Sequence, residues 1–182
     1  MNYTLDKSEV LFRGKVFDLK VDEITYDSGN KGIREVAIHS GGSVVVPVTN
    51  EGKIVLVKQY RYPFLKYMLE MPAGKLEKGE DPYLCAVREL EEETGYKAAS
   101  VVKLGAIATT PGFCTEILHL YIATGLTPGN HNREEGEATM KVFEYSFDEV
   151  ENLIAAGELY DAKSICAFHM AVSKLHQKNK TE

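Results

Sequence analysis

The chain has 182 residues and a formal net charge of −6, with 44% hydrophobic and 26% charged residues. This is enough for one ordinary domain with a buried core, which excludes a disordered chain. The acidity disfavours nucleic acid as a partner, since phosphate binding depends on clustered Lys and Arg. No apolar run approaches the roughly 20 residues that span a bilayer, and we expect no membrane association. The start lacks a signal-peptide core and the three cysteines are widely spaced, so we expect a cytoplasmic protein without disulfides or structural zinc.

The first sixty residues are predicted to be rich in β-strands. Alternating apolar residues and turn clusters such as Asp27–Gly32 mark where strands begin and end. Asn50–Lys53 predicts a tight hairpin turn between two strands. The strands are expected at Val16–Tyr26, Ile33–His39, Ser43–Val48 and Ile54–Tyr60.

A helix is predicted to follow, with clear signals at both ends. Asp81 is a good N-cap, Pro82 suits the first helical position, and Gly95 is placed to end the helix. At about 100° per residue, its apolar residues gather on one side, which we expect to face the core. These apolar residues are Tyr83, Leu84, Val87 and Leu90, while Glu89, Glu92 and Glu93 fall on the other side.

The rest of the chain adds strands and then two helices. This order favours an α/β (α+β) fold with a mixed sheet and helices packed on it, not a regular βαβ alternation. Thr127–Ala138 is expected to be a polar loop. The strands are expected at Val101–Ala108, Ile117–Thr124 and Lys141–Ser146, and the helices at Phe147–Ala156 and Asp161–Lys174.

The three glutamates of the predicted helix form an acidic cluster. Glu89, Glu92 and Glu93 lie one turn apart, and like charges at this spacing destabilise a helix by roughly 0.2–0.5 kcal/mol per pair. Converging carboxylates suit Mg²⁺ or Mn²⁺. An ordinary acidic surface helix is the alternative, and the carboxylates alone leave both open.

The spacing of the residues around this cluster is more specific. Residues 74–96 read Gly74-x5-Glu80-x7-Arg88-Glu89-Leu90-x-Glu92-Glu93-x-Gly95-Tyr96. This resembles the signature of the Nudix hydrolases, G-x5-E-x7-R-E-U-x-E-E-x-G-U with U apolar. The resemblance implies an α/β/α sandwich around a mixed sheet, and Mg²⁺-dependent attack of water on a nucleoside diphosphate linked to another group.

Residues outside the signature are similar to those of ADP-ribose pyrophosphatases within this superfamily. Glu70–Leu76 leads into the signature, and Pro111 lies 15 residues beyond Tyr96. The resemblance implies hydrolysis of ADP-ribose to AMP and ribose 5-phosphate. A GDP-mannose or other nucleotide-sugar pyrophosphatase is the alternative. A non-catalytic ADP-ribose-sensing Nudix domain is a further alternative, although all signature carboxylates are present.

The same resemblance assigns roles to individual residues. Arg88 matches the arginine that orients the carboxylates, and Glu92 takes an adjoining catalytic and metal-binding role. Glu116 matches an acidic residue near the terminal ribose or the metals, or it simply opens a strand. Phe17 matches an aromatic that stacks on adenine, or it is core. Arg34 and Arg61 match arginines that hold adenine and the diphosphate, or they are solvated strand residues. The metal ligands implied for two or three Mg²⁺ or Mn²⁺ ions are the Ala73 carbonyl, Glu89, Glu92 and Glu93.

The catalytic base is implied to be a glutamate of the loop at 127–138. This loop offers Glu134, Glu135 and Glu137. Glu137 lies nearest the following strand and is our first choice, and Glu135 is the second.

The resemblance also implies two parts of the chain. Residues 1–40 are expected to form an antiparallel β extension that serves dimerisation and substrate binding, and residues 41–182 the Nudix hydrolase domain. We therefore expect a homodimer, although these strands could instead extend the monomer's own sheet.

Overall fold

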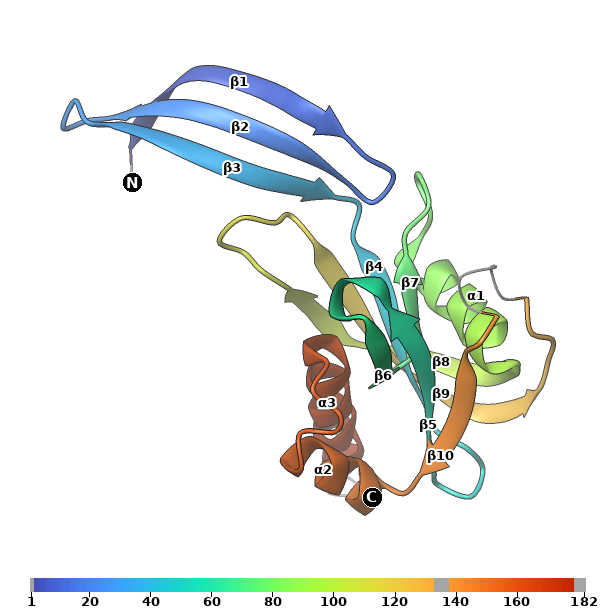
Figure 1. Cartoon of the computed structure of the whole chain (residues 1–182). Coiled ribbons are helices and arrows are strands. Elements are labelled where there is room, and N and C mark those ends of the chain that lie inside the picture. Colours follow the sequence, from blue (N-terminus) through green and yellow to red (C-terminus); the bar gives the residue numbers. More distant parts are fainter. Residues whose placement is uncertain (1, 133–137, 179–182) are drawn as a thin grey trace. The chain divides into compact units, whose positions relative to one another are not determined.

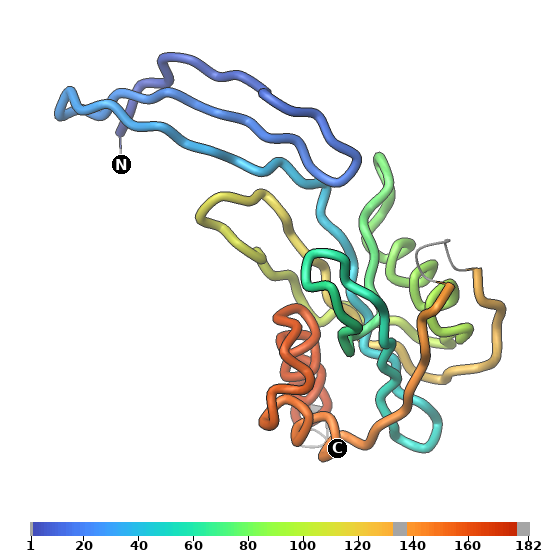
Figure 2. Tube along the Cα trace, viewed as in Figure 1, coloured from blue at the N-terminus to red at the C-terminus, as the bar shows by residue number. Residues whose placement is uncertain are grey.

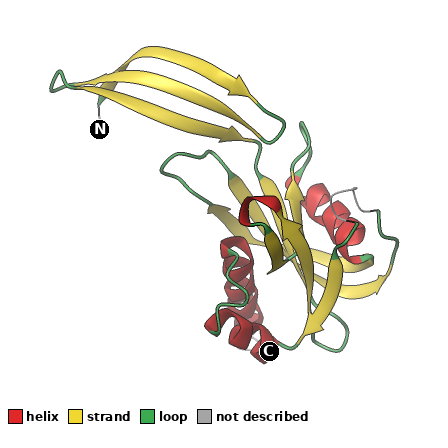
Figure 3. Cartoon of the chain, viewed as in Figure 1, coloured by secondary structure: helices red, strands yellow, loops and turns green. Residues whose placement is uncertain are grey.

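The computed structural model describes residues 2–132 and 138–178 of the chain. The chain divides into two compact units, which we describe one at a time. The first comprises residues 1–41 and 108–117, and the second comprises residues 42–107 and 118–182. The helices belong to the second unit, whereas the first is built of strands and loops (Figure 3).

The first unit is an antiparallel three-stranded sheet in the order β1-β2-β3. Its strands are β1 (Tyr3–Arg13), β2 (Phe17–Tyr26) and β3 (Lys31–His39), and they run side by side in Figure 2. The segment at 108–117 joins this unit through a bridge between Ala37 and Cys114. The sequence predicted β2 and β3 but gave β1 no bounds.

The second unit contains two sheets, in the orders β10-β5-β6 and β7-β4-β9-β8. The strand pair β4–β9 is parallel, whereas β4–β7, β5–β6 and β5–β10 are antiparallel, so the expected mixed arrangement is confirmed. The strands are β4 (Gly42–Pro47), β5 (Ile54–Arg61), β6 (Lys66–Glu70), β7 (Ala73–Lys75), β8 (Tyr96–Ala108), β9 (Ile117–Pro128) and β10 (Lys141–Tyr145).

The turn predicted at residues 50–53 is present but joins two different sheets. The N–H of Gly52 donates to the carbonyl of Thr49 at 3.0 Å, and Val48 forms a single antiparallel bridge with Ile54. Beyond that bridge, β4 continues in one sheet and β5 in the other. Local turn signals fix the reversal of the chain, but not which partner each strand takes.

The helices are α1 (Pro82–Thr94), α2 (Phe147–Ala155) and α3 (Ala162–Lys178), with a short 3₁₀ turn, η1 (Tyr62–Phe64). Both predicted caps of α1 are confirmed. The Asp81 carboxylate accepts from the N–H of Tyr83, and Gly95 is left-handed at φ 74°. No helix in the described part of the chain is long and apolar enough to cross a membrane.

The core of the second unit lies on both faces of β4. Val44 and Val46 pack in a cluster that includes Phe168 of α3, whereas Val45 packs in a second cluster with Leu90 of α1. Successive side chains of a strand point to opposite faces, so α1 and α3 lie on opposite sides of β4 (Figure 1). The layers are helix, sheet and helix.

The predicted core face of α1 is wrong in part. Tyr83, Leu84 and Val87 are exposed, whereas Glu89 and Glu93 are buried with Leu90. A helical wheel assigns burial by hydrophobicity, but here the sheet-facing side of α1 carries two carboxylates. The interior therefore has to supply polar partners for them.

Candidate functional site

Two buried glutamates of α1 form the centre of the site. Glu93 is 1% exposed and Glu89 is 7% exposed. The Glu89 carboxylate occupies the space beside Gly74 of β7, where a Cβ atom would overlap it. Glycine at residue 74 therefore makes room for the carboxylate. This steric requirement explains why the signature begins with a glycine.

The backbone leading into β7 supplies a partner for Glu93. The N–H of Ala73 donates to Glu93 Oε2 at 2.9 Å, and Gln59 Nε2 lies 3.5 Å from Glu93 Oε1. The carbonyl of the preceding residue, Pro72, accepts from the N–H of Val45 at 3.0 Å. This segment is thus held between β4 and α1, which fixes its polar groups beside the two glutamates.

Arg88 connects the other signature carboxylates. Its Nε lies 3.0 Å from Glu80 Oε1, and its Nη1 lies 2.6 Å from Glu89 Oε1 and 2.9 Å from Glu92 Oε2. The hydrogen bond to Glu80 raises the pKa of the Arg88 guanidinium above its ordinary value, although burial opposes this. The same bond lowers the pKa of Glu80. Arg88 therefore stays charged and offsets the repulsion among the glutamates.

Arg61 lies at the end of β5 in a second ionic cluster. It forms a bidentate ion pair with Glu70 of β6, and Lys163 of α3 also binds Glu70. The hydrogen bond to Glu70 raises the pKa of Arg61, burial opposes this, and the charge of Glu93 contributes a further increase. Arg61 is thus within electrostatic reach of Glu93 on α1.

The other predicted substrate residues belong to the first unit. Phe17 is 44% exposed and pairs with His39 in the sheet, and His39 Nδ1 lies 3.4 Å from Glu116 Oε1. Arg34 lies nearer the start of β3, opposite Asp22, and its guanidinium lies over the Tyr26 ring at 5.7 Å. The structure therefore brings Phe17 and Glu116 near a common histidine, while Arg34 contacts a tyrosine.

The predicted catalytic bases come from residues 134–137 of the sequence. Glu134, Glu135 and Glu137 lie outside the described residues. The roles assigned to them stay predictions.

The residues present fit a divalent cation that is held partly by the protein and partly by the phosphates of a substrate. Within residues 2–132 and 138–178, no group of three or more His, Cys, Asp or Glu side chains is arranged to hold a metal ion. Mg²⁺, however, commonly uses one or two carboxylates, several waters and substrate phosphates. Glu89 and Glu93 are two such carboxylates, and the absence of a Cβ at Gly74 leaves room for the carboxylate of Glu89.

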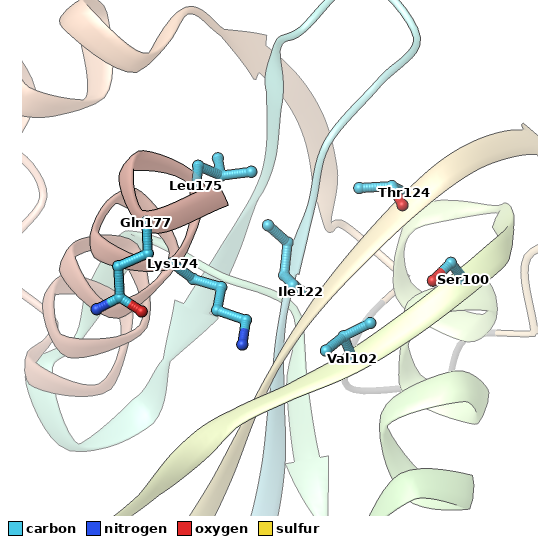
Figure 4. Close-up of a pocket in the computed structure, with 7 residues that line it drawn as sticks. All are labelled: Ser100, Val102, Ile122, Thr124, Lys174, Leu175 and Gln177. Carbon is cyan, nitrogen blue, oxygen red and sulfur yellow. The ribbon is translucent and has the colours of Figure 1, made fainter. Parts of the chain in front are cut away.

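A pocket elsewhere in the second unit contains none of the predicted residues. It has a volume of about 480 Å³ and lies between α3 and the strands β8 and β9 (Figure 4). No described acidic side chain lines it. Its lining residues are Ser100, Val102, Ile122, Thr124, Lys174, Leu175 and Gln177.

Sequence patterns assign no role to Glu70 or Lys163, which the structure joins in one ionic cluster with Arg61. Glu70 stands in a strand next to the apolar residues Leu69 and Met71. An acidic residue in such surroundings is a signal of a buried, paired carboxylate. Its partners, however, come from distant parts of the chain, so no spacing rule finds them.

Replacing Gly74 tests the close contact with Glu89. Gly74→Ala should lower the free energy of unfolding by roughly 1–3 kcal/mol, as overpacking of an interior does. Gly112→Ala is the matched control, because a Cβ at Gly112 meets no atom within 4 Å. It should stay within about 0.5 kcal/mol of wild type. Chemical denaturation measures both, and equal stability of the two variants would contradict the contact.

Comparison with known proteins identifies the family. Residues 39–168 match the NUDIX domain. The chain is 44% identical over 162 residues to the methanol dehydrogenase activator of Bacillus methanolicus, covering 88% of each chain. It is 43% identical over 160 residues to the ADP-ribose pyrophosphatase of Bacillus subtilis, covering 87% of this chain and 86% of that one.

The fold agrees with this assignment. A crystal structure of an ADP compounds hydrolase superposes with a TM-score of 0.86 at 18% identity, covering 98% of this chain and 96% of that one. At this identity the likeness shows the fold alone, and it confirms the predicted Nudix fold. The signature, the sandwich and the match over residues 39–168 agree: the chain belongs to the Nudix hydrolase superfamily.

Proposed function

We propose that the protein hydrolyses the diphosphate bond of ADP-ribose to AMP and ribose 5-phosphate. The observation that carries this proposal is the pair of buried glutamates on α1. Ala73 and Arg88 donate hydrogen bonds to them, and Gly74 leaves room for Glu89. The relative named ADP-ribose pyrophosphatase, 43% identical over most of both chains, supports the choice of substrate.

Glu89, Glu93, Glu92 and the carbonyl of Ala73 would hold two or three Mg²⁺ ions, with Mn²⁺ as a possible substitute. Such ions neutralise the diphosphate and lower the pKa of the attacking water. Arg88 orients Glu89 and Glu92 through the hydrogen bonds described above. Arg61 presents its guanidinium to the diphosphate, a group that guanidinium binds well.

Residues 1–40 are proposed to serve substrate binding and dimerisation. Phe17 would stack on adenine, Arg34 would contact the base, and Glu116 would lie near the terminal ribose. The first unit exposes several large apolar side chains, including Leu5, Leu11 and Phe12, which favours a homodimer. Light scattering that shows a monomer at micromolar concentration would contradict it. We also propose a cytoplasmic location, which the three free cysteines favour.

A second candidate is activation of a methanol dehydrogenase. The observation that favours it is the 44% identity to the activator from Bacillus methanolicus. Adding the protein to that dehydrogenase and following methanol oxidation tests this role directly.

The substrate can be tested with a panel of nucleotide sugars. We expect ADP-ribose to give the highest kcat/KM with Mg²⁺, and AMP and ribose 5-phosphate as products identified by mass spectrometry. GDP-mannose should react more slowly. Faster turnover of GDP-mannose would favour the alternative pyrophosphatase, and no turnover of any nucleotide sugar would favour a sensor.

Glu93→Gln tests the metal-binding role. The substitution keeps the side-chain volume and an oxygen that can accept from Ala73, so the fold should persist while most activity is lost. Ligand binding stabilises by mass action, about 2.7 kcal/mol at 100 times Kd. Mg²⁺ should therefore raise the melting temperature of the variant less than that of wild type. Glu91→Gln, on the same helix and paired with Lys97, is the control and should behave as wild type. Wild-type turnover by Glu93→Gln would refute the role.

The loop glutamates can be tested one at a time. A general base typically contributes roughly 10²–10⁴-fold to the rate. Glu137→Gln should lower kcat by at least the smaller factor and leave KM and the Mg²⁺ requirement nearly unchanged. Glu134→Gln and Glu135→Gln should stay near wild type. If only Glu135→Gln is inactive, Glu135 is the base. If all three remain active, the base lies outside this loop.

A further inference from the structure

Glu70 lies at the centre of an ionic cluster, and no role in catalysis or binding has yet been assigned to it. Glu70 ends β6, is 1% exposed, and meets Arg61 from β5 and Lys163 from the start of α3. Replacing such buried ionic clusters by apolar residues is often neutral or stabilising. Stability is therefore a weak explanation for this one, which suggests a role in positioning.

The contact between Arg61 and Glu70 fixes the orientation of the guanidinium. Arg61 Nε donates to Glu70 Oε1 at 2.6 Å, and Arg61 Nη2 donates to Glu70 Oε2 at 2.6 Å. Two parallel bonds define the plane of the group as well as its position. Among the described residues, none accepts a hydrogen bond from Nη1 of Arg61, and this side chain is 36% exposed. The edge with Nε and Nη2 is thus held by Glu70, an arrangement that we call the clamp. The edge with Nη1 remains available to a ligand.

Glu70 is itself held from the side of α3. Lys163 Nζ donates to Glu70 Oε2 and, at 2.9 Å, to Asp161 Oδ2. Ser164 Oγ donates to Asp161 Oδ2 at 2.5 Å and accepts from the N–H of Met71 at 2.7 Å. Two positive and two negative side chains therefore balance, and the start of α3 is tied to the segment that leads to Ala73.

Both partners of the clamp are ionised at neutral pH. Burial alone would raise the pKa of Glu70, but the hydrogen bond from Arg61 and the charge of Lys163 outweigh it, and the pKa is lowered. The stability that this pairing contributes is present above the pKa of an unfolded glutamate and is lost as the pH falls through the lowered folded value. The clamp therefore persists under neutral assay conditions.

We propose that Glu70 is a positioning residue, which holds Arg61 so that its available edge binds the diphosphate of the substrate. The proposal rests on the proposed function and deepens it. Arg61 alone could adopt many rotamers, and ordering a long side chain during binding costs affinity. A guanidinium fixed before the substrate arrives avoids that cost.

The test compares Glu70→Gln, Arg61→Ala and the double variant. ADP-ribose binding is measured by calorimetry in EDTA, where no turnover occurs under the proposed function, and kcat and KM are measured with Mg²⁺. Each single variant should bind ADP-ribose roughly 10- to 100-fold more weakly, as expected for loss of a charge-assisted hydrogen bond. The loss should appear in KM more than in kcat. The double variant should bind no more weakly than Arg61→Ala, because Glu70 acts through Arg61.

Glu144→Gln is the matched control, since Glu144 is an exposed carboxylate that accepts from Tyr96 and contacts no arginine among the described residues. If Glu70→Gln does not fold, Glu70→Asp replaces it, because the shorter side chain keeps the charge but cannot keep both bonds. Wild-type affinity in Glu70→Gln or Glu70→Asp would overturn the proposal, as would losses that multiply in the double variant. If wild type neither binds nor hydrolyses ADP-ribose, the proposed function fails too. If wild type hydrolyses ADP-ribose and the Glu70 variants bind it as tightly as wild type, the proposed function stands and this inference alone fails.

Discussion

The burial of two carboxylates of α1 against β7 is the constraint on which the site depends. An unpaired buried charge is costly, and the protein interior must supply partners or the group loses its charge. Glu93 accepts a hydrogen bond from the N–H of Ala73. Glu89 accepts one from Arg88 and occupies the space beside Gly74. The signature residues are thus explained one by one: the glycine makes room, the arginine offsets charge, and Glu80 holds the arginine.

This constraint also explains where the sequence prediction of α1 was right and where it was wrong. The helix ends depend on local chemistry, and Asp81 and Gly95 cap the helix as predicted. The buried face depends on what the rest of the chain provides. A wheel ranks Leu84 above Glu93 for burial, yet Leu84 is 58% exposed and Glu93 is 1% exposed. A hydrophobic pattern cannot anticipate an interior that supplies an amide and a guanidinium.

In the sheets, too, local features were predicted and long-range ones were not. The turn at residues 50–53 was predicted from Asn50 and Gly52, but the separation of β4 and β5 into two sheets was not. The parallel partner of β4 is β9, more than seventy residues away, and long-range pairing leaves no local signal. In the site, the acidic cluster was visible because its members share one helix. The cluster around Glu70 was not, because β5, β6 and α3 each contribute to it.

We propose that Glu89 and Glu93 hold a divalent cation beside the segment at Ala73. Crystals soaked in Mn²⁺ would test it through the anomalous scattering of the metal. We expect a peak in contact with carboxylate oxygens of Glu89 and Glu93 and with the carbonyl of Ala73, and its loss in Glu93→Gln crystals. Manganese bound only at other residues, or an unchanged peak in the Glu93→Gln crystals, would show that these two glutamates are not the metal ligands.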